Sequence, residues 1–550
     1  MKHISWRSLP NSTLLQIATV LLLFTGMFCW VLSLEYKTVG SLQFAMDDAW
    51  IHAAVAQNWL EGKGWGIVPN RTLSVSTSPT WTLSVALAAL FSSDMIYAVL
   101  GISFIYMAIT CVLLYLLIAR LSGVGLFGVL GVLLFLLNPI VIWGMAAGME
   151  LPLVLLALLL VLYLYYEYDA DSRVRLVAVP LSLAFAAVTR PEMFMLIPLA
   201  LLDTGFSLYQ KAVPAARRLA CRTFIIQAAI VLAGLSPYFL FNYANIGHLF
   251  PTTYYAKTIV RGVGLSAALQ DGSWNAIWDA LITNGVTQFH EIYARLFSFN
   301  LPLLLLLVPG SIFLSQQHGS TGKARGILIV LALLVLPYAM GVTSPAKDLS
   351  NHGDRYYVIF PALYIILGCL GLQFLQLQLR SRLLVAALVS LIVLLPWRQR
   401  FGGHQSIVRE AAKLLVKDVD STKRLYQDMG IWLRDNLPPE ARLAVNDIGG
   451  IAWYTRRDFI DVMGLSSPEI WPVLQRGYGA KLDQKRLRDY LKDQKVEYVV
   501  LCPKYYPQIT GNKEVFEEVM RWTEKYDHGR LISPQVLYKV HWDRSDPPIK

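Results

Sequence analysis

Long apolar runs alternate with short polar stretches along the first 400 residues of the chain. A helix crosses the hydrocarbon core of a bilayer with about 20 apolar residues, and most of these runs approach or reach that length. The pattern predicts about eleven membrane-spanning helices, near residues 13–34, 95–119, 123–141, 151–167, 176–189, 193–209, 223–241, 301–316, 326–343, 356–375 and 383–397.

Two shorter apolar segments lie between the first two spans. Residues 46–59 place Ile51, Val55 and Trp59 at intervals of four, which puts these side chains on one face of a helix. Such a helix is too short to span a bilayer, so we expect it to lie in the interface plane. Residues 79–92 are also apolar but short, and predict a second interfacial or re-entrant helix.

Basic residues indicate the orientation of the chain, because Lys and Arg concentrate in cytoplasmic loops. Lys2 and Arg7 precede the first span and place the N-terminus in the cytoplasm. The loop 35–94 is then external, and the other basic clusters fall on the inner side, at Arg120, Arg173, Arg175, Lys211, Arg217, Arg218, Arg222, Lys323, Arg325, Arg380 and Arg382.

The composition changes after Trp397. Residues 404–550 are rich in charge and contain no run of membrane length, and residues 422–436 predict an amphipathic helix. Short β-rich stretches follow, at 442–446, 458–463 and 496–502. We therefore expect a polytopic α-helical membrane domain over residues 1–400 and an external α/β domain over residues 401–550.

The overall composition excludes other classes of protein. Hydrophobic residues make up 55% of the 550 residues and charged residues only 15%, as in an integral membrane protein. The net charge of +11 comes mostly from the short loops that set orientation, so it does not indicate a nucleic-acid-binding protein. The five cysteines form no disulfide framework, and no Gly-rich phosphate loop or zinc-ligand spacing occurs.

Candidate chemistry gathers on the predicted outer face. The adjacent carboxylates of Asp47 and Asp48 begin the first short helix, although capping of that helix would also explain them. Further charged residues in the outer loops have simple structural roles available to them as well, such as helix-start acids, local ion pairs or snorkelling. These charged residues favour a functional site because they all occur on one face of the predicted bundle. They are Glu150, Arg190, Glu192, Lys257, Asp354 and Arg355.

This set of groups suits transfer of a sugar. A carboxylate can take the proton of an acceptor hydroxyl, and Arg or Lys can bind a phosphate leaving group. Asp47 and Asp48 could also hold a divalent cation, but two adjacent carboxylates are too few to decide that question.

An ordered series of motifs resembles the GT-C superfamily of membrane glycosyltransferases, which use polyprenyl-phosphate-linked sugars, and within it the terminal arabinofuranosyltransferase family. The series covers most of the chain, and it comprises DDAWIHAAVAQNWLEGKGWG (47–66), STSPTW (76–81), GME (148–150), TRPE (189–192), NYANIGHLFPTTYYAK (242–257), DRYYVIFPAL (354–363) and LAVNDIGGIAWYTRRDFIDVMGL (443–465).

The resemblance implies a GT-C fold and an inverting glycosyltransferase with Asp47 or Asp48 as catalytic base. Asp47 is slightly favoured because it comes first in the pair. The residues expected to line the donor and acceptor cavity are Glu150, Arg190, Glu192, Tyr255, Lys257, His352, Arg355 and Tyr356. Some family members end in a carbohydrate-binding β-sandwich, whereas this tail predicts a short α/β domain.

The implied reaction moves a sugar from a polyprenyl phosphate to an external glycan, lipid or protein hydroxyl. The family resemblance favours arabinofuranose as that sugar. The implied location is a bacterial inner membrane, with the active site and the C-terminal domain on the periplasmic side. One alternative is transfer of mannose or another hexose to protein or lipid A. Another is a transporter or flippase of lipid-linked sugars, which should show repeats and mid-membrane charges that this sequence lacks.

Overall fold

A computed structural model describes most of the chain. The candidate site residue His352 and the orientation signals Lys2 and Arg7 lie outside the described residues, as do several of the predicted inner basic residues. The described residues are 11–169, 172–209, 214–260, 262, 264–316, 326–343, 354–379, 381–397, 406–474, 482–525 and 533–544.

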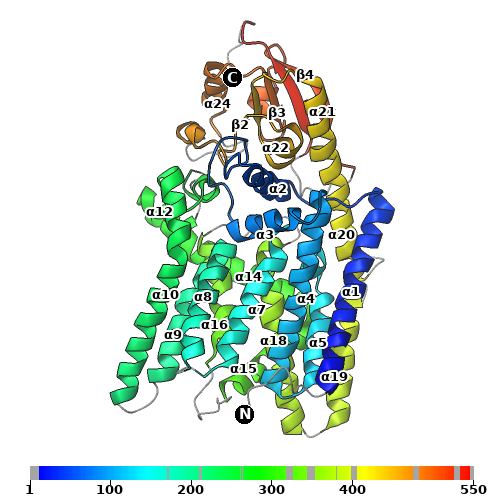
Figure 1. The fold of residues 1–550 in the computed structure, drawn as a ribbon, viewed down its shortest axis with the longest axis vertical. Coiled ribbons are helices and arrows are strands. Elements are labelled where there is room, and N and C mark those ends of the chain that lie inside the picture. The colour runs from blue at the N-terminus through cyan, green and yellow to red at the C-terminus, as the bar shows by residue number, and fades with distance from the viewer. Residues whose placement is uncertain are drawn as a thin grey trace.

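A bundle of helices forms one part of the molecule (Figure 1). Every predicted span coincides with helix in the structure. The helices of the bundle are α1 (Asn11–Val39), α4 (Met95–Ser122), α5 (Gly125–Leu136), α6 (Pro139–Gly144), α7 (Leu151–Glu167), α8 (Arg173–Thr189), α9 (Leu196–Tyr209), α10 (Pro214–Ile246), α14 (Gly285–Leu305), α15 (Leu307–Ser315), α16 (Leu328–Thr343), α18 (Ile359–Leu379) and α19 (Arg382–Leu394).

Length and apolar character identify which of these helices can cross a membrane. Within the described residues four helices pass on both criteria, or up to five if the bent pair 274–305 and 307–315 is one span. The four helices that meet both criteria are 11–39, 95–122, 220–246 and 355–379, and the bundle also contains shorter apolar helices. The chain is therefore a multi-pass membrane protein.

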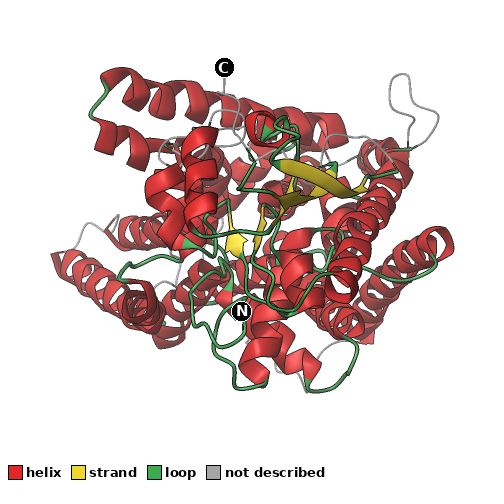
Figure 2. Ribbon diagram, turned by 90° about the horizontal axis from the view of Figure 1, so that it is seen from above, coloured by secondary structure: helices red, strands yellow, loops and turns green. Residues whose placement is uncertain are grey.

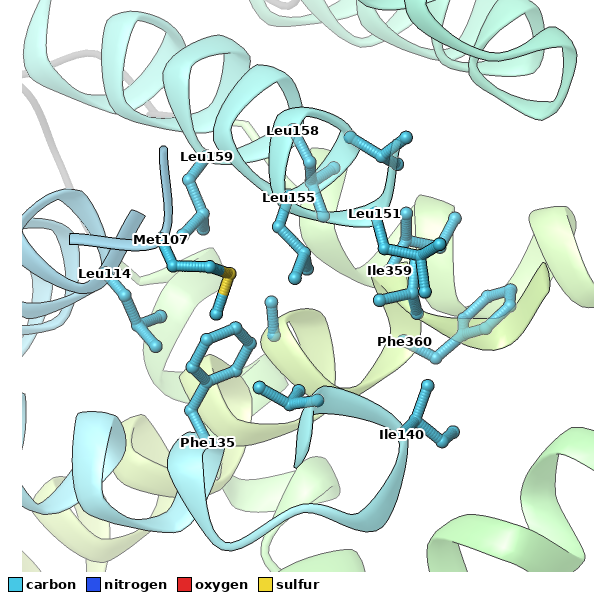
Figure 3. Packing of buried hydrophobic residues seen from close by; sticks show 14 of the residues in the cluster. Met107, Leu114, Phe135, Ile140, Leu151, Leu155, Leu158, Leu159, Ile359 and Phe360 are labelled. Atoms are coloured by element: carbon cyan, nitrogen blue, oxygen red, sulfur yellow. The ribbon is translucent and has the colours of Figure 1, made fainter. Parts of the chain in front are cut away.

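The centre of the bundle is a continuous apolar core. Side chains from α4, α5, α7 and α18 meet there, and Figure 3 shows Met107, Phe135 and Leu155 facing one another, with Ile359 to one side of them. All four are nearly inaccessible to solvent. Helix α18 is buried along most of its length, so it is the central helix around which the others pack.

Glycines allow two helices to approach closely in this core. A Cβ atom on Gly310 of α15 would lie 2.0 Å from the carbonyl oxygen of Leu367, and one on Gly371 of α18 would lie 2.3 Å from that of Leu306. Small residues at helix contacts are the usual means of close packing in membranes. Helices α15 and α18 accordingly pack backbone against backbone.

Two short helices lie across one end of the bundle, as the sequence predicts. They are α2 (Asp47–Leu60) and α3 (Pro79–Ala89). The expectation that α2 rests on a bilayer through one apolar stripe is wrong. Ile51 and Val55 are buried but Trp59 is 47% exposed, and α2 is covered on opposite sides by α3 and by the C-terminal α22 (Gly449–Thr455) (Figure 1). Protein on both sides replaces the membrane surface as its environment.

Further short elements connect the helices of the bundle. The predicted external segment 242–300 is largely helical, and parts of it are π-helical. The connecting elements are η2 (Pro191–Met195), α11 (Thr252–Tyr255), η3 (Ala256–Val260), α12 (Gly264–Asp271), α13 (Trp274–Trp278), η4 (Asp279–Asn284) and η5 (Arg355–Tyr357).

A small α/β domain caps the same end of the bundle as α2 (Figures 1 and 2). Its sheet has the strand order β2-β1-β3-β5-β4, in which β2, β1 and β3 run parallel and β5 and β4 are antiparallel. The three predicted strands are confirmed as β1, β2 and β3, whereas β4 and β5 were not predicted. The strands are β1 (Leu443–Val445), β2 (Ile460–Asp461), β3 (Tyr498–Leu501), β4 (Phe516–Trp522) and β5 (Gln535–Val540).

A nearly continuous helix links the bundle to this domain. Its three parts are α20 (Ile407–Thr422), the π-helical η7 (Lys423–Asp428) and α21 (Met429–Asn436), which confirms the helix predicted over 422–436. Helix α20 packs on α1 and α6, and Asp418 accepts a hydrogen bond from the Trp143 indole at 2.8 Å. The remaining elements of the domain are η8 (Pro468–Ile470), α23 (Trp471–Leu474), α24 (Gln484–Asp493) and α25 (Pro507–Thr510).

The glycine contact between α15 and α18 gives a stability prediction. Gly371→Ala should lower the thermal unfolding midpoint, since overpacking a close contact typically costs about 1–3 kcal/mol. The control is Gly101→Ala on α4, where a Cβ meets no atom within 4 Å. Differential scanning fluorimetry in detergent measures both variants, and equal midpoints for the two would contradict the close-packing account.

Candidate active site

Asp47 is the first residue of α2, but it does not act as a cap for that helix. The N-cap position is Met46, and the Asp47 carboxylate instead bonds to the C-terminal domain. Its two oxygens accept hydrogen bonds from the backbone N–H groups of Gly449 and Gly450, at 2.8 and 2.7 Å. Asp47 is only 9% exposed. The simple capping interpretation is therefore wrong for Asp47.

Asp48 faces the bundle and forms an ion pair with Arg355. Its carboxylate lies 2.8 Å from the Arg355 guanidinium, and its side chain is 32% exposed, whereas that of Arg355 is 7% exposed. The neighbouring Asp354 pairs with Arg295 at 2.5 Å. Arg355 thus connects η5 to the acidic pair on α2.

A second group of ion pairs surrounds Arg190, which follows α8. Its guanidinium lies 3.2 Å from both Glu150 and Glu192. It also donates a hydrogen bond to the backbone carbonyl of Arg355 at 3.4 Å. The guanidinium carbons of Arg190 and Arg355 lie 4.8 and 5.0 Å from the centre of the Tyr356 ring. The two cations therefore share one aromatic ring and one buried environment.

His52 joins this group one turn along α2, and the sequence analysis did not single it out. Its Nδ1 lies 2.8 Å from the Thr82 hydroxyl, and its Nε2 lies 3.9 Å from Glu150. Burial lowers the pKa of His52, although the nearby Glu150 opposes the shift. Lys257 on η3 is close enough for its charge to lower the same pKa. The imidazole is therefore neutral near pH 7.

Tyr255 takes a different position from the other predicted site residues. Its ring packs on those of His248 and Trp471, with centroids 4.5 and 6.1 Å away, at the boundary with the C-terminal domain. Asp48, Glu150, Arg190, Glu192, Lys257, Arg355 and Tyr356 are brought together, although they come from separate parts of the sequence.

Asp447 contributes a third carboxyl group from the C-terminal domain. It accepts hydrogen bonds from the Tyr426 hydroxyl at 3.1 Å and from the Gln535 amide at 2.7 Å. Burial, with the nearby Asp47 charge, raises the pKa of Asp447 well above its usual range. Burial likewise raises the pKa of Asp47 to about 7, although the bonds from Gly450 and Gly449 act in the opposite direction. No pattern in the sequence indicates that Asp447 lies near Asp47.

The positively and negatively charged groups of the cluster are equal in number. Three carboxylates, from Asp48, Glu150 and Glu192, lie among three cations, from Arg190, Arg355 and Lys257. Among the residues that the structure describes, no group of three or more His, Cys, Asp or Glu side chains is placed to hold a metal ion. Chemically, the cluster offers a partly exposed carboxylate beside guanidinium groups that suit a phosphate.

Known proteins share features with this chain at the level of one domain and of the whole fold. Residues 417–540 match the model of a domain of unknown function (DUF8728). No curated protein matches the chain. ArnT from Cupriavidus metallidurans bound to undecaprenyl phosphate is similar at a TM-score of 0.53 and 11% identity, with 96% of this chain and 99% of that chain covered.

Two more solved structures are similar over most of their length. The apo state of the same ArnT gives a TM-score of 0.52 at 12% identity, covering 94% of this chain and 97% of that one. The Archaeoglobus fulgidus oligosaccharyltransferase, tethered to an acceptor peptide with an NVT sequon, gives 0.54 at 10% identity, covering 93% and 75%. The predicted fold class is confirmed: the chain has the fold of GT-C membrane glycosyltransferases.

Buried ion pairs around Arg190 give a second stability prediction. Arg190→Gln leaves the carboxylates of Glu150 and Glu192 without their cation, and removing one partner of a buried pair costs about 3–5 kcal/mol. Glu150→Gln in the same chain should recover part of the lost thermal stability, because it removes one uncompensated charge. Arg434→Gln, at an exposed pair with Asp435, should leave the midpoint unchanged. Equal effects of Arg190→Gln and Arg434→Gln would contradict the prediction.

The raised pKa of Asp47 predicts a pH dependence of stability. The folded chain holds this proton up to about pH 7, whereas the unfolded chain releases it near the ordinary value of 3.8. Stability from this group is therefore present at low pH and is lost as the pH rises through about 7. The unfolding midpoint of the wild type should fall relative to that of Asp47→Asn as the pH is raised from about 5 to about 8. A constant difference between the two curves would count against the shift.

Proposed function

We propose that this chain is an inverting glycosyltransferase that moves a sugar from a polyprenyl-phosphate donor to a hydroxyl acceptor. The observation that carries the proposal is the Asp48–Arg355 pair, 2.8 Å apart, with Arg190 held against the same Tyr356 ring. A candidate base thus lies directly beside candidate phosphate-binding groups. The fold shared with ArnT and the oligosaccharyltransferase supports the same class of reaction.

Asp48 is the better candidate for the catalytic base. The sequence order slightly favoured Asp47, but both oxygens of Asp47 are occupied by backbone N–H groups and the residue is nearly buried. Asp48 is about one-third exposed and reaches the cation-rich side of α2. A general base has to come within hydrogen-bond reach of the acceptor hydroxyl, and Asp48 is the residue of the pair that a substrate can approach.

The donor phosphate would compete with Asp48 for Arg355. Guanidinium groups bind phosphate bidentately, so donor binding would draw Arg355 away and release the Asp48 carboxylate. That carboxylate then takes the proton of the acceptor hydroxyl, whose oxygen forms a bond to C1 of the sugar. The bond between C1 and the phosphate oxygen breaks, and the polyprenyl phosphate leaves with the electron pair. Arg355, Arg190 and Lys257 stabilise the charge of the leaving group.

The donor sugar, the acceptor and the side of the membrane are proposed from the sequence analysis. Arabinofuranose is the proposed donor sugar, with mannose or another hexose as the alternative. The proposed acceptor is a glycan, lipid or protein hydroxyl on the periplasmic side of a bacterial inner membrane, where the basic loops place the site and the C-terminal domain. The charges of the site gather at one end of the bundle rather than at its middle, which favours a transferase over a transporter or flippase of lipid-linked sugars.

Sugar transfer by the purified full-length protein tests the proposal. The protein in detergent is given a panel of polyprenyl-phosphate sugars, pentofuranoses and hexoses, with a panel of glycan, lipid and peptide acceptors. We expect one donor to turn over and Asp48→Asn to lower kcat by about 10²–10⁴-fold, the range for removal of a general base.

The matched control is Asp435→Asn, the same change at an exposed carboxylate of α21. It should retain wild-type transfer. A wild-type kcat in Asp48→Asn would refute the role of Asp48 as base. Absence of transfer from every donor to every acceptor would refute the proposed reaction.

A further inference from the structure

The domain matched as one of unknown function contacts the acidic pair directly. Residues 417–540 contain Gly449 and Gly450, whose N–H groups donate one hydrogen bond to each oxygen of the Asp47 carboxylate, at 2.8 and 2.7 Å. Asp47 lies about 400 residues earlier in the chain, within the helical bundle's loop region. The first helix of the candidate site is therefore attached to the C-terminal domain through a bidentate contact.

Glycine is required at position 449 because the two backbones approach closely. A Cβ atom there would lie 2.1 Å from the Asp47 carbonyl oxygen and 3.0 Å from its side-chain Cγ. Both neighbours are close to the α2 backbone, so they cannot move aside without moving the helix. At Gly450 a Cβ would instead meet Tyr426 of the same domain at 2.6 Å. The close approach between the two parts is thus specific to Gly449.

Other contacts hold α2 along its length. The Trp50 ring packs on Trp453 and Tyr454 of the C-terminal domain, with centroids 5.5 and 5.1 Å away. Beyond the C-terminal end of α2, Glu61 pairs with Arg456 at 2.5 Å. Helix α2 therefore has contacts to the C-terminal domain near its start, in its first turn and just past its end, and rotation about its own axis is restricted.

We propose that the C-terminal domain acts as a clamp for the catalytic carboxylate. Gly449 and Gly450 hold Asp47, and Asp47 in turn fixes the direction in which its neighbour Asp48 projects toward Arg355. Asp47 and Gly449 are then positioning residues, because they act through Asp48. The catalytic part of this inference depends on the proposed function, whereas the clamp contact itself does not.

Amide hydrogen exchange tests the contact independently of catalysis. In the full-length wild-type protein the amides of Gly449 and Gly450 should exchange slowly. The comparison is made at about pH 8, where Asp47 is ionised because the pH is above its raised pKa of about 7. In Asp47→Asn, which conserves shape and removes the charge, exchange of a peptide covering 447–455 should then accelerate about tenfold, since a hydrogen bond to a charged group is lost. The strand β3 serves as the internal control and should not change. Unchanged exchange at 447–455 would overturn the clamp.

Kinetics then tests positioning. Gly449→Ala removes no carboxylate but displaces α2, so it should lower kcat about 10²-fold with little change in KM for the donor, because small misplacements of a reacting group have costs of that size. The control is Gly511→Ala, at the glycine that directly follows α25 in the same domain, and it should keep the wild-type kcat. If Asp47→Asn and Gly449→Ala act through one contact, the double variant should lose no more activity than the worse single variant.

The outcomes separate the clamp from the proposed reaction. Additive losses in the double variant, or a wild-type kcat in Gly449→Ala, would overturn the positioning role. If the wild type transfers no sugar, the proposed function fails, and hydrogen exchange in Asp47→Asn still decides whether the clamp exists. If Gly449→Ala does not fold, Asp47→Asn carries both readouts, because it introduces no steric conflict.

Discussion

The contact between the Asp47 carboxylate and the Gly449–Gly450 backbone connects the two parts of this molecule. Burying a carboxyl group is costly unless hydrogen bonds satisfy it, and here two backbone N–H groups do so. The position of α2 follows from this contact and from the packing of Trp50 on the C-terminal domain. Because Asp48 is the next residue, its direction follows as well.

The rest of the candidate site depends on charge balance in a buried environment. Arg190 and Arg355 lie beside one tyrosine ring, and each has a carboxylate within about the distance of a hydrogen bond. Such groups are expensive at a membrane protein's interior unless they are paired. A phosphate that entered this cluster would replace carboxylates as the partner of the guanidinium groups. The cations that pair with these carboxylates would then be the ones that bind the phosphate.

Elements with unusual helical geometry lie next to this cluster. Lys257 is carried by the π-helical η3, which continues directly from α11. In that stretch Thr252 and Thr253 donate hydrogen bonds to the carbonyls of Ser74 and Val75, so the segment is attached to the loop between α2 and α3. π-helical turns recur at functional sites because they redirect a side chain within a helix. Here the turn presents a cation to the end of the bundle.

The sequence by itself determined the membrane class, the helices over the apolar runs, the two short helices and the first three strands, because hydrophobic length and periodicity are local properties. It also singled out most of the charged residues of the candidate cluster, since charges near a bilayer are conspicuous. Only the tertiary structure decided the partners: Arg355 pairs with Asp48, Asp354 pairs with Arg295, and α2 is covered by α3 and α22. His52, Asp447 and the two glycines were missed for the same reason. Their roles arise from contacts between segments up to about 400 residues apart, which no local pattern of the chain encodes.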